Sequence, residues 1–189
     1  MTDGFEIQPL RPFTREEVWP LLTGYETHEV YRVEKHESDE ITRIEIRLEQ
    51  LAEPFSDNFE VDFGPEEFVW YHQVLEKGFS FGAYRAGRLI GLLLGEAFAE
   101  KALLRVWEIQ VHAEFRGMGV GRALMERAFD QARQAGLKMV MLETQNTNVQ
   151  AIRFYRKMGF GLEALDISEY AHLGGRYVEQ SAFYMKRRL

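Results

Sequence analysis

Glycines and arginines gather in the segment RGMGVGR, where together they could bind an anion. Three glycines occur within five residues, and glycine adopts the positive φ angles that let neighbouring backbone N–H groups converge. A helix predicted directly after the segment would add the positive end of its dipole, and the two arginines add full charges. The segment therefore predicts a pyrophosphate site, with a glycine-rich turn and two solvated arginines as the simpler alternative. This glycine loop consists of Arg116, Gly117, Met118, Gly119, Val120, Gly121 and Arg122.

The spacing within the glycine loop narrows the choice of phosphate ligand. No GK[ST] follows, which excludes a P-loop. The glycines are spaced G-x-G-x-G, and Arg122 stands where a dinucleotide fingerprint would have its last glycine. Four residues, His112 to Phe115, also separate the loop from the preceding strand. The spacing and these four residues disfavour a dinucleotide fold. Glu143, however, ends the next strand, as the ribose-binding acid of such a fold would, so a dinucleotide site stays open.

The elements that must position this loop follow from hydrophobic periodicity. Residues 41–51 and 103–112 alternate apolar and polar side chains as strands do, and 119–136 carries an apolar stripe at helical spacing. In 103–112, Trp107, Ile109 and Val111 are expected on one face, with Glu108 and Gln110 on the other. Further helices are predicted at 14–22, 65–78 and 148–159, the first with a capping box of Thr14 and Glu17. Further strands are predicted at 5–9, 30–35, 138–144, 160–165 and 181–187, with a hairpin over 79–98 that turns at 86–87 and a loop over 55–63.

Mostly antiparallel strands followed by the order β-α-β-α-β-β predict a mixed α/β fold around one central sheet. With 189 residues, the chain is expected to form a single domain, 1–189. Its 23 basic and 30 acidic residues give a net charge of −7, which disfavours a general nucleic-acid partner.

The residue types that are missing or scattered exclude several chemistries. Cysteine is absent, which removes disulfides, thiolate metal sites and an acyl-cysteine intermediate. The five histidines lack ligand spacing, so no metal site is expected. The longest apolar run, 89–95, is too short to span a membrane. The first residues have neither a basic nor an apolar signal region, so we expect a cytoplasmic protein without a signal peptide.

Several segments together resemble one family. The strand WEIQV, the loop R-x-x-G-x-G, the strand LET and the run NVQAIRFYRKMGF are similar to the GNAT superfamily of acetyl-CoA-dependent N-acetyltransferases. The similarity is densest over 103–160. MLETQNTNVQAIRFYRKMGF is most similar to the streptothricin acetyltransferases within that superfamily, whereas the chain departs from their pattern after Phe160. The resemblance implies the GNAT fold, a central, mostly antiparallel twisted sheet with helices on both faces.

The resemblance also implies roles for individual residues. Acetyl-CoA would be the co-substrate, without a metal, and its pyrophosphate would lie on the glycine loop. The backbone of Ile109, Gln110 and Val111 would pair with the pantetheine arm, and an N–H near Val111 would polarise the thioester carbonyl. Asn148 would hydrogen-bond the same arm, with helix N-capping as its alternative.

Two residues are candidates for proton transfer. Tyr155 lies seven residues after Asn148, close to the same helical stripe, and the resemblance implies that it protonates the leaving thiolate; core packing is the alternative. Glu108 is the candidate base for the amine, and a solvated charge is its alternative. Glu163, Asp166 and Glu169 could contact a cationic acceptor, although exposed surface positions are the simpler interpretation.

These features predict direct acetyl transfer to a primary amine of a small cationic molecule, with a streptothricin-type antibiotic as the leading acceptor. Acetylation of a protein N-terminus or lysine is an alternative, and a non-catalytic acyl-CoA sensor is an alternative of another class. The expected partner is the small-molecule amine, with no nucleic acid and no membrane. The oligomeric state stays open, a homodimer being one arrangement.

Overall fold

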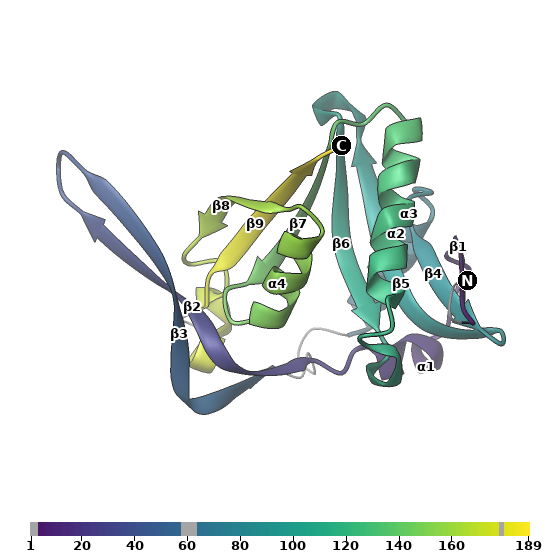
Figure 1. Cartoon of the computed structure of the whole chain (residues 1–189), viewed down its shortest axis with the longest axis horizontal. Helices are drawn as coiled ribbons and strands as arrows, with labels where there is room; N and C mark the ends of the chain where they lie inside the picture. Colours follow the sequence, from purple (N-terminus) through teal and green to yellow (C-terminus); the bar gives the residue numbers. More distant parts are fainter. Residues whose placement is uncertain (1–3, 58–63, 178–179) are drawn as a thin grey trace. The chain divides into compact units, whose positions relative to one another are not determined.

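The computed structural model describes residues 4–57, 64–177 and 180–189 (Figure 1). The chain divides into two compact units, which are described separately. Unit 1 comprises the described residues of Met1–Gly24, Asn58–Leu142 and Arg187–Leu189, and unit 2 comprises those of Tyr25–Asp57 and Glu143–Lys186. Both units contain strands and helices, and the strands pair mostly antiparallel, so the mixed α/β class expected from the sequence is confirmed.

The strands of unit 1 are ordered β1-β4-β5-β6-β7. They are β1 (Glu6–Pro9), β4 (Phe81–Arg85), β5 (Arg88–Phe98), β6 (Leu103–Val111) and the first residues of β7 (Met139–Gln145). All neighbours pair antiparallel except β6 and β7, which are parallel. The predicted hairpin turn between β4 and β5 is confirmed. Ala86 and Gly87 both have positive φ, 49° and 80°, as a tight hairpin turn requires.

Helices of unit 1 cover both faces of its sheet. They are α1 (Arg15–Val18), α2 (Pro65–Leu75) and α3 (Val120–Gln134). Leu92 and Leu94 of β5 belong to a buried cluster with Tyr71 of α2. On Gly91, the residue directly before Leu92, a Cβ would lie 3.0 Å from Val120 of α3. Because successive strand residues point to opposite faces, α2 and α3 lie on opposite faces.

Local signals explain where these helices begin and end. At α1 the capping box is confirmed: Glu17 N–H donates to Thr14 Oγ1, and Thr14 N–H donates to Glu17 Oε2 at 2.8 Å. The apolar stripe of α3 is buried as predicted. Gly136, with φ of 74°, terminates that helix in the left-handed conformation that glycine favours.

Unit 2 contains a long hairpin, one helix and the end of the chain's main sheet. Its elements are β2 (Tyr25–Glu37), β3 (Thr42–Asp57), α4 (Val149–Lys157), β8 (Gly161–Asp166) and most of β9 (Ala182–Arg188). β2 and β3 pair antiparallel, and β9 lies between β7 and β8. Short 3₁₀ turns complete the described chain at Trp19–Leu21, Ala99–Lys101, Ala113–Phe115, Ala171–Leu173 and Gly175–Tyr177.

One predicted element is wrong. The loop expected over 55–63 begins too early, because Phe55 pairs with Thr27 and Asp57 with Tyr25 as part of β3. The sequence AEPFSD lacks the regular alternation that marks a strand, and its pairing with a distant partner overrides that local signal. The remainder of the predicted loop, 58–63, lies outside the described residues. Of the helices in the described chain, none is long and apolar enough to cross a membrane.

Candidate active site

Strand β6 presents backbone groups along one edge. Its parallel register with β7 joins Leu103–Val106 to Met139–Leu142, and residues 107–111 lie beyond that register. On the other edge, His112 N–H donates to the Ile90 carbonyl at 2.9 Å. In an antiparallel pair, alternate residues direct their N–H and C=O groups to the partner strand. The backbone groups of Ile109 and Val111 therefore point away from β5.

A β-bulge changes the faces of β6. Leu94 pairs with Glu108 and Gly95 with Val106, so Trp107 is an extra residue in the ladder. The Trp107 ring packs against the buried cluster that includes Leu94. The expectation that Trp107 and Glu108 lie on opposite faces is therefore wrong. The extra residue interrupts the alternation, and both side chains lie on the face that α2 covers.

Glu108 is held by two side-chain donors. The Tyr71 hydroxyl donates to Glu108 Oε2 at 3.0 Å, and Gln110 Nε2 donates to Glu108 Oε1 at 2.7 Å. Tyr71 is 5% exposed, whereas Glu108 and Gln110 are half-buried. We call these three residues the Glu108 seat. The alternative for Glu108 was a solvated charge. In the structure each of its two carboxylate oxygens instead accepts a hydrogen bond from a side chain.

The glycine loop follows β6 in the same unit. Gly117 and Gly119 have φ angles of 78° and 85°, and a Cβ at either position would meet no atom within 4 Å. Gly119 is the N-cap of α3, and no side chain caps this helix end. The first N–H groups of a helix have no partner within the helix, so this end offers backbone donors to an anion. The predicted anion site thus has suitable backbone geometry.

The side chains of the glycine loop do different things. Arg116 fastens the loop: its guanidinium donates to the Val111 carbonyl at 3.1 Å and to Thr23 Oγ1 at 2.7 Å. Arg122 lies 3.6 Å from Glu126 in an exposed ion pair. Val120 is buried, Met118 is exposed, and Gly121 lies in the first turn of α3. Because these acceptors of the Arg116 guanidinium are neutral oxygens, its positive charge stays at the loop.

Two further predicted residues lie on α4 in unit 2. Asn148 is the N-cap of this helix, and its Oδ1 accepts the Ala151 N–H at 3.2 Å. The N-cap interpretation of Asn148 is thus confirmed, and its contact with the pantetheine arm stays a prediction. Tyr155 is 7% exposed, and its ring meets Phe160 edge-on with centroids 6.0 Å apart. Its acid role stays a prediction.

Unit 2 also holds a polar pair that the sequence did not reveal. The Tyr170 hydroxyl donates to Glu143 Oε1 at 2.5 Å. Burial raises the pKa of Tyr170 above its ordinary value, and the negative charge of Glu143 raises it further. The hydroxyl therefore remains a donor at any ordinary assay pH. The two residues lie 27 positions apart, and no local pattern links them.

Asn146, directly after β7, has a structural role. Asn146 is 2% exposed; its side chain donates to the Tyr31 carbonyl at 3.0 Å and accepts the Ser181 N–H at 2.9 Å. Buried amides need such partners, and here they join β2 to the residue that follows β7 and the residue that precedes β9, all within unit 2. The sequence alone does not predict these hydrogen bonds, because Tyr31 and Ser181 are far from Asn146 in the chain.

The three carboxylates expected near a cationic acceptor are not gathered by one contact. Asp166 accepts the N–H of Ser168 at 2.8 Å and closes a turn. Glu169 accepts from the Tyr184 hydroxyl at 3.2 Å, and Glu163 is exposed. Within the described residues, no group of three or more His, Asp or Glu side chains could hold a metal ion.

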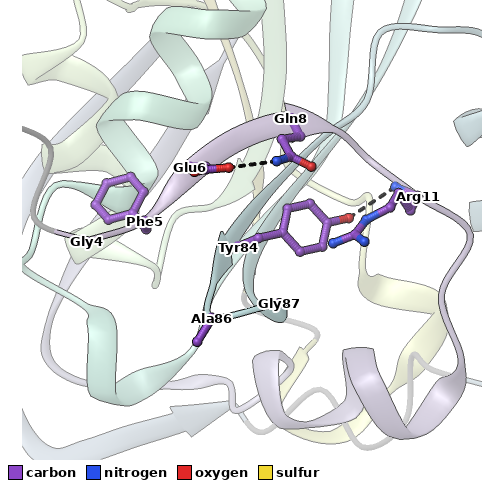
Figure 2. A pocket seen from close by; sticks show the side chains of 8 residues that line it. All are labelled: Gly4, Phe5, Glu6, Gln8, Arg11, Tyr84, Ala86 and Gly87. Carbon is purple, nitrogen blue, oxygen red and sulfur yellow. Dashed lines mark hydrogen bonds between the residues drawn. The ribbon is translucent and has the colours of Figure 1, made fainter.

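A pocket of about 550 Å³ lies elsewhere in unit 1 (Figure 2). It is formed by β1, the segment after it and the β4–β5 turn, and none of the predicted site residues lines it. The Arg11 guanidinium lies over the Tyr84 ring, 4.0 Å from its centroid, and the Arg11 N–H donates to the Tyr84 hydroxyl at 3.1 Å. The pocket therefore contributes nothing to the candidate active site.

Comparison with known proteins decides the family. The model of the acetyltransferase (GNAT) family matches residues 44–160, more than half of the chain. The chain belongs to the GNAT acetyltransferase family. The matched region includes β6, the glycine loop, α3, β7 and α4, and so contains the elements described above. The predicted family and the predicted fold are both confirmed.

Individual relatives of this GNAT acetyltransferase share parts or all of its length. Streptothricin acetyltransferase from Streptomyces lavendulae is 39% identical over 84 residues, which cover 44% of each chain, so the match spans less than half of that relative. The crystal structure of nourseothricin acetyltransferase is similar over 98% of both chains, with 27% identity and a TM-score of 0.73. A Bacillus anthracis protein solved with acetyl coenzyme A has the same TM-score, 22% identity and coverage of 98% and 99%.

Proposed function

We propose that this GNAT acetyltransferase transfers the acetyl group of acetyl-CoA to a primary amine of a small cationic molecule, and that the acceptor is of the streptothricin type. Residues 1–189 would act as a single N-acetyltransferase domain in the cytoplasm. The family match supports acetyl transfer. Similarity to enzymes named for streptothricin and nourseothricin supports the acceptor class.

The observation that carries the proposal is the continuity of β6 with the glycine loop. The backbone groups of Ile109 and Val111 point away from β5, and a few residues later the chain offers the uncapped N-terminus of α3. A strand edge can pair with the amides of an extended arm, and a helix N-terminus can bind a pyrophosphate. Coenzyme A has an extended pantetheine arm followed by a pyrophosphate, the same order as the strand edge and the helix N-terminus in this chain.

The residues present fit the three tasks of the transfer. Acetyl-CoA supplies the acetyl group as a thioester. Glu108 would take the proton that the amine must lose, directly or through a water. The Val111 N–H would stabilise negative charge on the carbonyl oxygen, and Tyr155 would give a proton to the departing sulfur. With no cysteine in the chain, the acetyl group would pass directly to the amine.

The charge of the chain supports a cationic acceptor. Its net charge of −7 favours the approach of positively charged molecules. Carboxylates in unit 2 are oriented by tyrosine hydroxyls, Glu143 by Tyr170 and Glu169 by Tyr184. Tyrosine rings next to oriented carboxylates are suited to ammonium groups, which interact with both charge and ring faces.

The test is a thiol-release assay with acetyl-CoA and a panel of amines. The panel contains a streptothricin, linear polyamines, peptides with free N-termini or lysines, and neutral amino acids, and mass spectrometry identifies the acetylated product. We expect the streptothricin to react with the highest kcat/KM. A panel in which only peptides react would assign the protein to N-terminal or lysine acetylation. Binding of acetyl-CoA without turnover of any amine would assign it to the sensor class.

A further inference from the structure

The Glu108 carboxylate receives a hydrogen bond from a side chain that no local pattern connects with it. Tyr71 lies in α2, 37 residues before Glu108, and its hydroxyl is 3.0 Å from Glu108 Oε2. The ring of Tyr71 is buried, 5% exposed, in the cluster that contains Leu92 and Leu94. A buried tyrosine has little rotational freedom, so its hydroxyl is a fixed point for the carboxylate.

The contact between α2 and β6 involves two consecutive residues on each element. Trp70 meets Trp107 edge-on, with centroids 5.3 Å apart and an interplanar angle of 85°, while Tyr71 donates to Glu108. The bulge at Trp107 makes this possible, because it brings both β6 side chains to the face that α2 covers. Packing of the two tryptophans thus adds a second contact between α2 and β6 beside the hydrogen bond of the Tyr71 hydroxyl.

We propose that Tyr71 is a positioning residue of the acetyl transfer: its buried hydroxyl fixes the Glu108 carboxylate in the orientation from which it accepts the proton of the amine. This inference rests on the proposed function of Glu108 as the base. A carboxylate offers about four lone-pair directions. Tyr71 and Gln110 each donate to a different oxygen, so the two hydrogen bonds together fix the plane of the carboxylate.

The hydrogen bond also has a consequence for protonation. A donor to a carboxylate stabilises the charged form, and its removal makes the group easier to protonate. Other charged and titratable groups of α2, β5 and β6 lie around this contact, and Tyr71→Phe leaves them unchanged. Arg105 lies over the Trp107 ring at 3.9 Å, Glu96 accepts from Trp107 Nε1 at 3.1 Å, and His72 contacts the Phe68 carbonyl at 3.0 Å.

The experiment measures kcat/KM against pH for Tyr71→Phe, with acetyl-CoA and the best acceptor of the panel. Loss of a hydrogen bond to a charged group predicts a fall of about 10-fold to 100-fold at neutral pH. The acid limb of the profile should move to higher pH by on the order of one unit. The KM for acetyl-CoA should stay within about 3-fold, because the glycine loop is unchanged.

Tyr84→Phe is the matched control. Tyr84 is buried to a similar degree, 8% exposed, in the same cluster, and its hydroxyl also makes one hydrogen bond, with the Arg11 N–H (Figure 2). It should lose a comparable amount of thermal stability and keep the wild-type pH profile. A Tyr71→Phe enzyme whose acid limb does not move overturns the proposal, whatever happens to its melting temperature.

Two further variants keep the outcomes separate. If Tyr71→Phe fails to fold, a monofluorinated tyrosine placed at position 71 keeps volume and hydroxyl and strengthens the donor, so the acid limb should move to lower pH; an unmoved limb rejects the proposal. Glu108→Gln tests the base itself. An inactive Glu108→Gln beside an unshifted Tyr71→Phe refutes only the positioning role, whereas a fully active Glu108→Gln refutes the base.

Discussion

The glycine loop and the Glu108 seat are adjacent in the chain and built by opposite means. In the loop, the groups that could meet a ligand are backbone N–H groups, and open space surrounds the positive-φ glycines. In the seat, side chains donate the two hydrogen bonds described above, and one of these side chains comes from a helix 37 residues away. Backbone sites tolerate changes that spare their φ angles, whereas a seat of side chains depends on each partner. The two regions should therefore fail differently.

Glu108→Gln should cause the largest loss and should affect turnover. The amide keeps the volume and still accepts the Tyr71 hydrogen bond, but it cannot take a proton. We expect kcat to fall by about 10²-fold to 10⁴-fold, with the Kd for acetyl-CoA unchanged within a few-fold. Steady-state kinetics and calorimetry measure the two quantities. A Glu108→Gln variant that binds acetyl-CoA more weakly and keeps its kcat would show that Glu108 acts in binding and not in turnover.

Tyr155→Phe extends the comparison to unit 2. It removes a phenol whose ordinary pKa, about 10, suits proton donation to a thiolate, and it preserves the packing against Phe160. As an acid, Tyr155 predicts a fall in kcat of about 10²-fold or more with little change in thermal stability. As a core residue only, it predicts normal kcat and a lower melting temperature. Full activity in the variant would exclude the acid role.

Gly119→Asp should produce the opposite pattern in the glycine loop. Gly119 has a φ of 85°, which strains any residue with a Cβ, and the added charge would lie beside the pyrophosphate. Like charges in contact cost several kcal/mol, so the Kd for CoA should rise by about 10²-fold.

Gly136→Asp is its control, because Gly136 ends the same helix with a φ of 74° and has similar open space. It carries the same strain and charge away from the proposed pyrophosphate. Both variants should unfold at lower temperature, and calorimetry should find weaker CoA binding only for Gly119→Asp. Equal CoA affinity in the two variants would refute the proposal that the pyrophosphate binds at the glycine loop.

The smallest effect is expected from Tyr170→Phe, at alkaline pH. In the folded chain the pKa of Tyr170 lies above its ordinary value of 10.0, chiefly through burial and then through the charge of Glu143. The unfolded chain therefore releases this proton first, and stability is lost as the pH rises above about 10. Tyr170→Phe has no such proton. Its melting temperature should decline less steeply than that of the wild type between pH 9 and 11, and parallel curves would contradict this.

The sequence predicts the glycine loop well because its determinants are local. The glycine spacing, the start of the helix that follows and the amphipathic stripe of α3 all lie within about twenty residues. The capping box is local too, because Thr14 and Glu17 are three residues apart. Asn148 as an N-cap is local in the same sense. Hydrophobic periodicity and caps are properties of neighbouring residues, and they survive folding unchanged.

The parts that the sequence did not predict depend on distant pairing. Alternation placed Trp107 and Glu108 on opposite faces, because a bulge has no signature in one strand alone; it exists only in the register with β5. Tyr71 with Glu108 and Tyr170 with Glu143 meet through the fold. The extension of β3 over Phe55 likewise requires its partner, Thr27. Such contacts follow from tertiary packing, which local propensity does not encode.

The bulge at Trp107 determines which face of the sheet the end of β6 presents. Glu108 already pairs with Leu94 and Val106 with Gly95, so deleting Trp107 would leave an unbroken ladder in which every side chain from Glu108 onward keeps its face. Forming a regular ladder with Trp107 retained would instead shift those residues by one position and move each of their side chains to the opposite face. A one-residue gap at Trp107 would thus preserve both the strands and the face of Glu108. Sequence alignments of related proteins can therefore be gapped at this position without a change in chemistry.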